Sequence, residues 1–242
     1  MEHIPSTAVE YRNDEPDVKA EGYWVLGYFA VYLGYLFLRL ENEFFHWFSL
    51  VVVPFTVVLF SRRMRTKLWD RSSAFHSVGL RKGNLTNGLV WAIVIGIALS
   101  TLQLVLSRNS GEIIKLFVSG KALLLFPLSF LLIFCLAGFT EEFFFRGVMQ
   151  TRLQQLFGSK VLAVVLTSLL FGLYHLPYAY LNPQWPSYGN WPEAFGAAFG
   201  QGVPLGLILG TVYARTNSNL FACVVLHALV NSLPGMVWIK IG

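Results

Sequence analysis

Residues 140–147 read Thr-Glu-Glu-Phe-Phe-Phe-Arg-Gly and directly follow an apolar segment, residues 122–139, that contains no charged side chain. An ionisable side chain at the centre of a membrane helix costs about 2.5–3.5 kcal/mol on insertion scales, and less near the interface. Glu141, Glu142 and Arg146 therefore need partners. Charged residues at this depth predict a functional site.

The composition around this stretch is that of a membrane protein. Of the 242 residues, 55% are hydrophobic and 13% are charged, whereas soluble domains carry about 25% charged residues. A span takes about 20 residues, so the length predicts an all-α, polytopic transmembrane bundle of seven to eight helices in the lipid bilayer. The net charge of +5 does not indicate a nucleic-acid partner, because the cations cluster in predicted loops.

The chain is expected to hold a polar N-terminal tail, residues 1–21, without a signal sequence, and a single transmembrane domain, residues 22–242. Within that domain, residues 22–107 form N-terminal spans and residues 121–233 form the core that carries the motifs. Pro177 and Pro234 are expected to end the fifth and seventh helices. The predicted spans are residues 22–40, 44–60, 85–106, 122–157, 161–176, 194–213 and 220–233.

The glycine-rich sixth span, residues 194–213, allows close helix contacts within one chain or between two, which leaves the oligomeric state open. With seven spans, the N-terminal tail and the loops at 61–83, 146–160 and 214–218 share one side and hold 13 of the 18 Lys and Arg residues. The positive-inside rule then predicts a cytoplasmic N-terminus. The membrane is the cell membrane of a prokaryote or the endoplasmic reticulum membrane of a eukaryote, and the side of access stays open.

The polar residues of this core have compatible spacings. Glu142 and Arg146 are i, i+4 neighbours on one helix face, while Glu141 points about 100° away and stays free for another partner. Glu141 lies 17 residues before Gly158 and His175 lies 17 after it. Antiparallel helices joined at Gly158 would therefore bring Glu141 and His175 to one level.

His227 and Asn231 are again i, i+4 neighbours, on the seventh predicted helix. Each residue alone is typical of structural packing: an intramembrane histidine, an interhelical amide or an ion pair. Together, an acidic dyad and two histidines in three apolar helices predict a shared polar site. A carboxylate and an imidazole can activate water, and an imidazole with an amide can hold an oxyanion, which outlines amide hydrolysis. Zinc bound by His175, His227 and a glutamate is the competing chemistry.

At these residues the sequence resembles the CAAX protease and bacteriocin-processing family of intramembrane glutamic endopeptidases, which includes the Ras-converting enzyme. The family pattern EExxxR, FxxxH and HxxxN/D appears in that order over residues 121–233. It reads Glu141-Glu142-Phe-Phe-Phe-Arg146, then Phe171-Gly-Leu-Tyr-His175, then His227-Ala-Leu-Val-Asn231.

The resemblance implies a metal-independent protease without a cofactor, in which Glu141 activates water with help from His175. It implies that His227 and Asn231 form the oxyanion hole and that Glu142 and Arg146 support the site. The implied substrate is a membrane-anchored protein or peptide, for instance a prenylated one. Three alternatives remain: a non-catalytic immunity or scaffold protein with a structural polar cluster, a zinc-dependent protease and a transporter.

Overall fold

The computed structural model describes residues 16–38, 43–66, 71–80, 85–107 and 109–241. Nine continuous helices cover these ranges, and they contain no strand. The predicted all-α class is therefore confirmed, whereas the predicted seven to eight membrane-spanning helices compare with six candidate spans among the nine helices described. The helices are α1 (Pro16–Phe37), α2–η1–α3 (Glu43–Trp47, Phe48–Val52, Val53–Thr66), α4 (Arg71–Ser77), α5 (Leu85–Leu106), α6 (Ser110–Val118), the long helix Ala122–Phe157, α10 (Lys160–Leu181), α11–η4–α12 (Trp191–Ala197, Ala198–Gly202, Val203–Arg215) and α13 (Leu220–Ile241).

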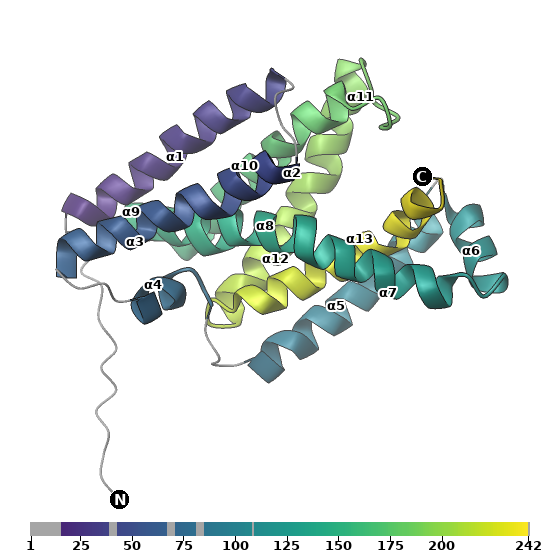
Figure 1. Cartoon of the computed structure of the whole chain (residues 1–242), viewed down its shortest axis with the longest axis horizontal. Helices are drawn as coiled ribbons and strands as arrows, with labels where there is room; N and C mark the ends of the chain where they lie inside the picture. The colour runs from purple at the N-terminus through teal and green to yellow at the C-terminus, as the bar shows by residue number, and fades with distance from the viewer. Residues whose placement is uncertain (1–15, 39–42, 67–70, 81–84, 108, 242) are drawn as a thin grey trace, which may run out of the picture.

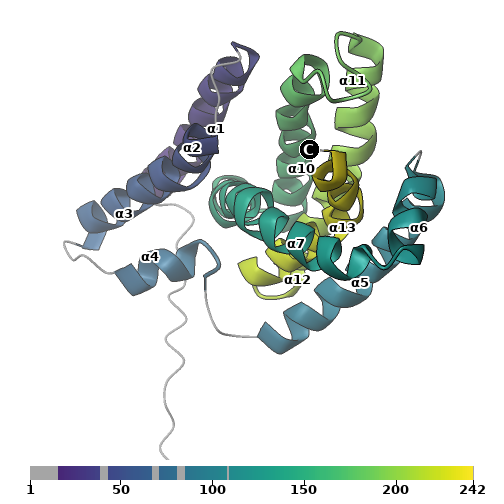
Figure 2. The same cartoon turned by 45° about the vertical axis from the view of Figure 1, so that its right-hand side comes forward.

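The long helix is the axis of the fold and lies across the whole molecule (Figure 1). It changes register twice, because π-helical turns alternate with α-helical ones. Figure 2 shows α1, α2 and α3 on one side of this helix and α10, α12 and α13 on the other. Its consecutive segments are α7 (Ala122–Ile133), η2 (Phe134–Gly138), α8 (Phe139–Glu142), η3 (Phe143–Gln150) and α9 (Thr151–Phe157).

Within the described residues, six helices are long and apolar enough to cross a membrane, and the chain is a multi-pass membrane protein. The sequence predicted seven spans, and the difference is α1. This helix begins at Pro16, inside the expected polar tail, and carries Asp17, Lys19 and Glu21 in its first turns. These charges, together with its tyrosines and glycines, lower its hydropathy. Residues 1–15 of the expected tail lie outside the described ranges.

Contacts show which ends of the helices share one end of the bundle. The Glu21 carboxylate accepts from Nε of Arg152 at 3.2 Å, so the start of α1 lies beside α9. At the other end of α1, the rings of Phe37 and Trp191 are 6.3 Å apart. The N–H of Leu220 donates to the Gly79 carbonyl at 3.1 Å. The predicted grouping of the loops near residues 79, 158 and 217 is confirmed, while the cytoplasmic assignment of that end stays a prediction.

Glycines let α12 approach α10 inside one chain. A Cβ at Gly206 would lie 3.0 Å from Cα of Ser168, and a Cβ at Gly202 would lie 3.1 Å from Cα of Gly172. Gly196 and Gly200 have no such neighbour within 4 Å. The glycine series of the sixth span therefore splits into a half that packs against α10 and a half that does not.

Two helices continue through prolines that were expected to end them. Helix α10 passes Pro177 and ends at Leu181, and α13 passes Pro234 and ends at Ile241. Membrane helices tolerate proline because side-chain hydroxyls and neighbouring helices satisfy the freed backbone groups. Near Pro234, the Ser129 hydroxyl donates to the carbonyl of Ser232 at 3.0 Å. The predicted ends at 176 and 233 are therefore wrong.

Candidate active site

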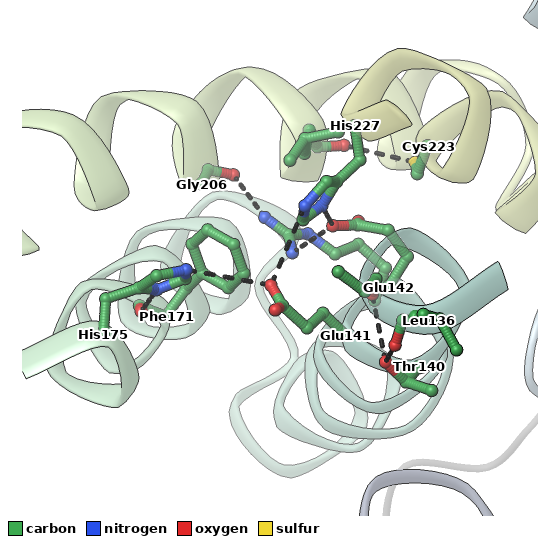
Figure 3. Close-up of polar contacts among 12 residues, drawn as sticks. Leu136, Thr140, Glu141, Glu142, Phe171, His175, Gly206, Cys223 and His227 are labelled. Atoms are coloured by element: carbon green, nitrogen blue, oxygen red, sulfur yellow. Dashed lines mark hydrogen bonds and ion pairs between the residues drawn. The ribbon is translucent and has the colours of Figure 1, made fainter. Parts of the chain in front are cut away.

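Three helices bring the acidic dyad and the two histidines together (Figure 3). Nε2 of His175 lies 3.8 Å from Oε2 of Glu141, and Nε2 of His227 lies 3.9 Å from the same oxygen. Glu141 belongs to the long helix, His175 to α10 and His227 to α13. The prediction that Glu141 and His175 lie opposite each other, at equal spacing from Gly158, is confirmed. His227 lies close to the same carboxylate, as predicted.

Glu142 is anchored through one carboxylate oxygen by two other members of the cluster. Its Oε1 accepts from Nη1 of Arg146 at 2.9 Å and from Nδ1 of His227 at 2.8 Å. Both Glu142 and Arg146 are fully buried, so each charge depends on its partner, because a buried charge without one is costly. The predicted i, i+4 pair is confirmed, and His227 is a third member.

Arg146 also connects the long helix to its neighbours. Nη2 donates to the Gly206 carbonyl of α12 at 3.3 Å, and the guanidinium carbon lies 4.4 Å from the centre of the Phe171 ring. A guanidinium over an aromatic face gains a cation–π attraction. One turn further on, Gln150 donates to the Gly210 carbonyl at 3.0 Å. Arg146 and Gln150 thus each hydrogen-bond a backbone carbonyl in the part of α12 that packs closely against α10.

Glu141 and Glu142 each have one buried carboxylate oxygen without a hydrogen bond, but Glu142 is anchored through its other oxygen and no such anchor is seen for Glu141 within the described residues. Oε2 of Glu141 makes no hydrogen bond within the described part of the chain, because both imidazoles stand just beyond hydrogen-bond distance. In Figure 3 this carboxylate points between the rings of His175 and His227. A buried polar oxygen facing two more polar atoms at almost 4 Å is the arrangement that a bridging molecule would complete.

The hydrogen bonds of His175 identify its neutral tautomer. Nδ1 lies 2.7 Å from the carbonyl oxygen of Phe171, and a carbonyl can only accept. The proton is therefore on Nδ1, and Nε2 carries the lone pair that faces Glu141. The imidazole also packs edge-on against the Phe171 ring at 4.6 Å, which fixes its plane.

Asn231 lies on α13 one turn beyond His227 and is partly buried. No hydrogen bond joins it to the cluster among the residues that the structure describes. The structure thus brings five of the six predicted site residues into contact. Asn231 is connected to them only by its position four residues after His227 on α13.

The backbone at the site is π-helical, which the sequence did not predict. Segment η3 starts directly after Glu142 and includes Arg146. π-Helical turns within α-helices occur frequently at functional sites. Side chains cap two carbonyls of this segment: the Thr151 hydroxyl donates to Arg146 at 3.2 Å and Arg152 donates to Gly147 at 3.2 Å.

Sequence reasoning missed one residue next to the site, His46. His46 of α2 lies 2.9 Å, from Nε2 to Oγ1, from Thr140, the residue that precedes Glu141. The only signal in the sequence was a histidine near the start of the apolar run 44–60. This signal is weak, because ordinary residues at the membrane interface show the same pattern.

The fold and the site define a multi-pass membrane protein with a buried glutamate–histidine cluster. Residues 123–233 match the family model described as Type II CAAX prenyl endopeptidase Rce1-like. This segment of the chain is therefore a domain of the Rce1-like CAAX prenyl endopeptidase family, and the resemblance seen over residues 121–233 is confirmed. No curated protein and no solved structure matches the chain.

Proposed function

We propose that the chain is an intramembrane endopeptidase of the glutamic type, which hydrolyses a peptide bond in a membrane-anchored protein or peptide. The observation that carries the proposal is the position of Glu141, whose buried Oε2 faces Nε2 of His175 at 3.8 Å and Nε2 of His227 at 3.9 Å. The family of residues 123–233 supports the same reaction class.

The charges of the cluster support different protonation states for the two histidines. Glu141, Glu142 and Arg146, all ionised, leave one net negative charge, and one imidazolium would bring the buried cluster to neutrality, which a low dielectric favours. His227 suits this role because its Nδ1 faces Glu142 and its Nε2 faces Glu141. His175 suits the neutral form, because its Nδ1 faces an uncharged carbonyl.

These states give each group a task in amide hydrolysis. A water between Glu141 and His175 can donate one hydrogen to the carboxylate and the other to the Nε2 lone pair, which makes its oxygen nucleophilic. As this oxygen attacks the scissile carbonyl, one proton passes to Glu141. Glu141 then delivers the proton to the leaving nitrogen as the C–N bond breaks.

The developing oxyanion needs donors on the opposite side of the scissile carbonyl. Nε2–H of an imidazolium at His227 and the amide of Asn231, one turn apart on α13, can supply them. Each such donor is commonly worth about 2.7–4 kcal/mol of transition-state stabilisation. Glu142 orients His227 through the bond at 2.8 Å, and Arg146 holds Glu142 in place.

The deciding experiment compares wild type, Glu141→Gln and Glu193→Gln in proteoliposomes with a panel of membrane-anchored peptides, prenylated C-terminal peptides among them. Glu193 is exposed at the start of α11, so its variant matches the chemistry of the change away from the site. We expect cleavage by wild type and Glu193→Gln and a loss of at least about 100-fold in Glu141→Gln. Equal cleavage by all three would overturn the role of Glu141, and a folded wild type that cleaves no peptide would favour a non-catalytic scaffold.

A further inference from the structure

A short helix outside the family domain holds the turn that carries Glu141. Helix α2 ends with His46 and Trp47, and both contact the long helix just before the acidic dyad. Nε2 of His46 lies 2.9 Å from Oγ1 of Thr140, and the Trp47 ring stacks on Phe139 with centroids 5.6 Å apart. Two consecutive residues of α2 thus contact Phe139 and Thr140, the two residues that precede Glu141.

The hydrogen bonds of Thr140 show which way the His46 contact runs. Its hydroxyl proton is directed to backbone carbonyls, because Oγ1 lies 2.7 Å from the Leu136 oxygen and 3.0 Å from the Ala137 oxygen. A hydroxyl has a single proton, so the remaining lone pair of Oγ1 accepts from Nε2–H of His46.

This hydroxyl sits where the helix changes register. Leu136 and Ala137 belong to η2, and Thr140 belongs to α8, the single α-turn that carries Glu141. The Thr140 side chain, fully buried, therefore joins the last π-turn to the catalytic turn. His46 fixes the position of the oxygen that makes this connection.

The orientation of Glu141 depends on its backbone more than that of Glu142 does. Oε1 of Glu142 is anchored by Arg146 and His227, whereas no comparable anchor holds the Glu141 carboxylate among the described residues, and its Oε2 is buried without a hydrogen bond. A small rotation of the turn 139–142 would move this carboxylate relative to both imidazoles. The contacts that hold residues 139–142 in place therefore also determine where the Glu141 carboxylate, the proposed general base, lies.

We propose that His46 is a positioning residue for Glu141 and acts through the hydroxyl of Thr140, with Trp47 holding the same turn from the adjacent position. The inference rests on the proposed function, because it assigns His46 to the reaction that Glu141 performs. His46 lies outside residues 123–233, so this assignment gives the N-terminal part of the chain an indirect, positioning part in catalysis.

The test uses the full-length protein with His46→Leu, which removes the donor, and His46→Gln, whose amide N–H can replace it. Thr140→Val and Thr140→Ser form the same pair at the acceptor, and Phe44→Leu is the matched control, since Phe44 lies on α2 with 73% of its surface exposed. We expect His46→Leu and Thr140→Val to lower kcat about 10- to 100-fold at unchanged KM, because a misplacement near 1 Å can cost about 100-fold.

The conservative variants and the combination separate positioning from stability. His46→Gln, Thr140→Ser and Phe44→Leu should keep the wild-type kcat, and the double variant His46→Leu/Thr140→Val should lose no more than either single one. A wild-type kcat in His46→Leu, a loss that glutamine does not rescue, or additive losses in the double variant would overturn the proposal. If His46→Leu does not fold, the Thr140→Val and Thr140→Ser pair decides alone.

A second readout needs no substrate. The side-chain NMR resonances of His175 and His227 report the position of the Glu141 carboxylate, and they should shift in His46→Leu and Thr140→Val but not in Phe44→Leu. Shifts without any cleavage by wild type would refute the protease and leave the positioning role. Cleavage with neither a kcat change nor a shift would refute the positioning role and leave the protease.

Discussion

Nδ1 of His227 lies 2.8 Å from Oε1 of Glu142, and Glu142 is thereby the link between the imidazole and the guanidinium of Arg146. The second glutamate of the dyad is thus an anchor for the α13 histidine. The first glutamate, Glu141, faces Nε2 of both imidazoles at 3.8 and 3.9 Å. One sequence motif supplies two carboxylates with different surroundings.

Breaking the buried pair should cost stability whether or not the protein is an enzyme. We expect Glu142→Ala and Arg146→Ala each to lower the free energy of unfolding by about 3–5 kcal/mol, because the partner is left as an uncompensated buried charge. Thermal unfolding in detergent measures the change. Glu112→Ala is the control, because its partner Lys115 is exposed and exposed pairs contribute little. Unchanged melting temperatures in both site variants would contradict a structural role for the pair.

The close approach of α12 should be sensitive to a single methyl group. Gly206→Ala would set a Cβ 3.0 Å from Cα and Cβ of Ser168, and overpacking of this kind costs about 1–3 kcal/mol. The displaced helix would also carry the Gly206 carbonyl away from Arg146, so cleavage should fall together with stability.

Gly196→Ala provides the comparison on the same continuous helix. Its Cβ would meet no atom within 4 Å, and a helical Gly→Ala change in open space stabilises by about 0.4–1 kcal/mol. Equal melting temperatures for the 206 and 196 variants would show that the contact between α10 and α12 is looser than the structure has it.

The ion pair between Glu21 and Arg152 should hold α1 against α9. The guanidinium of Arg152 also donates to the carbonyls of Ser77 and Gly147, each at 3.2 Å, so Arg152→Ala removes several bonds at once. We expect a loss of about 3–5 kcal/mol, since Glu21 is 91% buried and its Oε2 loses the guanidinium of Arg152.

A double-mutant cycle with Glu21→Gln isolates the pair itself, and its coupling energy should lie between about 0.5 and 3 kcal/mol. Chemical unfolding in mixed micelles provides the four values. A coupling energy of zero would mean that the two charges stabilise the fold through separate partners.

Removal of metal ions should leave the proposed activity unchanged. Among the residues described, no three His, Cys, Asp or Glu side chains are grouped as ligands of an ion, and Arg146 already supplies the positive charge beside Glu142. Peptide cleavage before and after treatment with a chelator measures the effect. Activity that falls with the chelator and returns with zinc would instead assign His175 and His227 as ligands.

Much of the site followed from the sequence because helix geometry is regular. Equal spacing about Gly158 placed Glu141 opposite His175, and i, i+4 spacing paired Glu142 with Arg146. The helix ends near Pro177 and Pro234 could not be predicted in the same way, because a membrane helix can continue past proline when its surroundings allow it, and those surroundings are set by the tertiary packing. The contact of His46 with Thr140 depends on the docking of α2, which no local pattern encodes.

The roles of Glu141, His175, His227 and Asn231 in the reaction stay predictions, as do the cytoplasmic N-terminus and the prenylated substrate. The π-helical turns were also beyond the sequence. The sequence of residues 134–150 gives no sign of the change in register at η2 and η3.

The Glu21–Arg152 pair has a consequence for how this protein can be divided. Arg152 lies within residues 123–233, while Glu21 and the residues that cover Phe144 and Phe145, Tyr28 and Phe29 among them, lie outside. A fragment cut to the family-matching segment would bury a guanidinium without its counter-ion and bare two phenylalanine rings. We therefore expect residues 123–233 on their own to be less stable than they are in the whole chain.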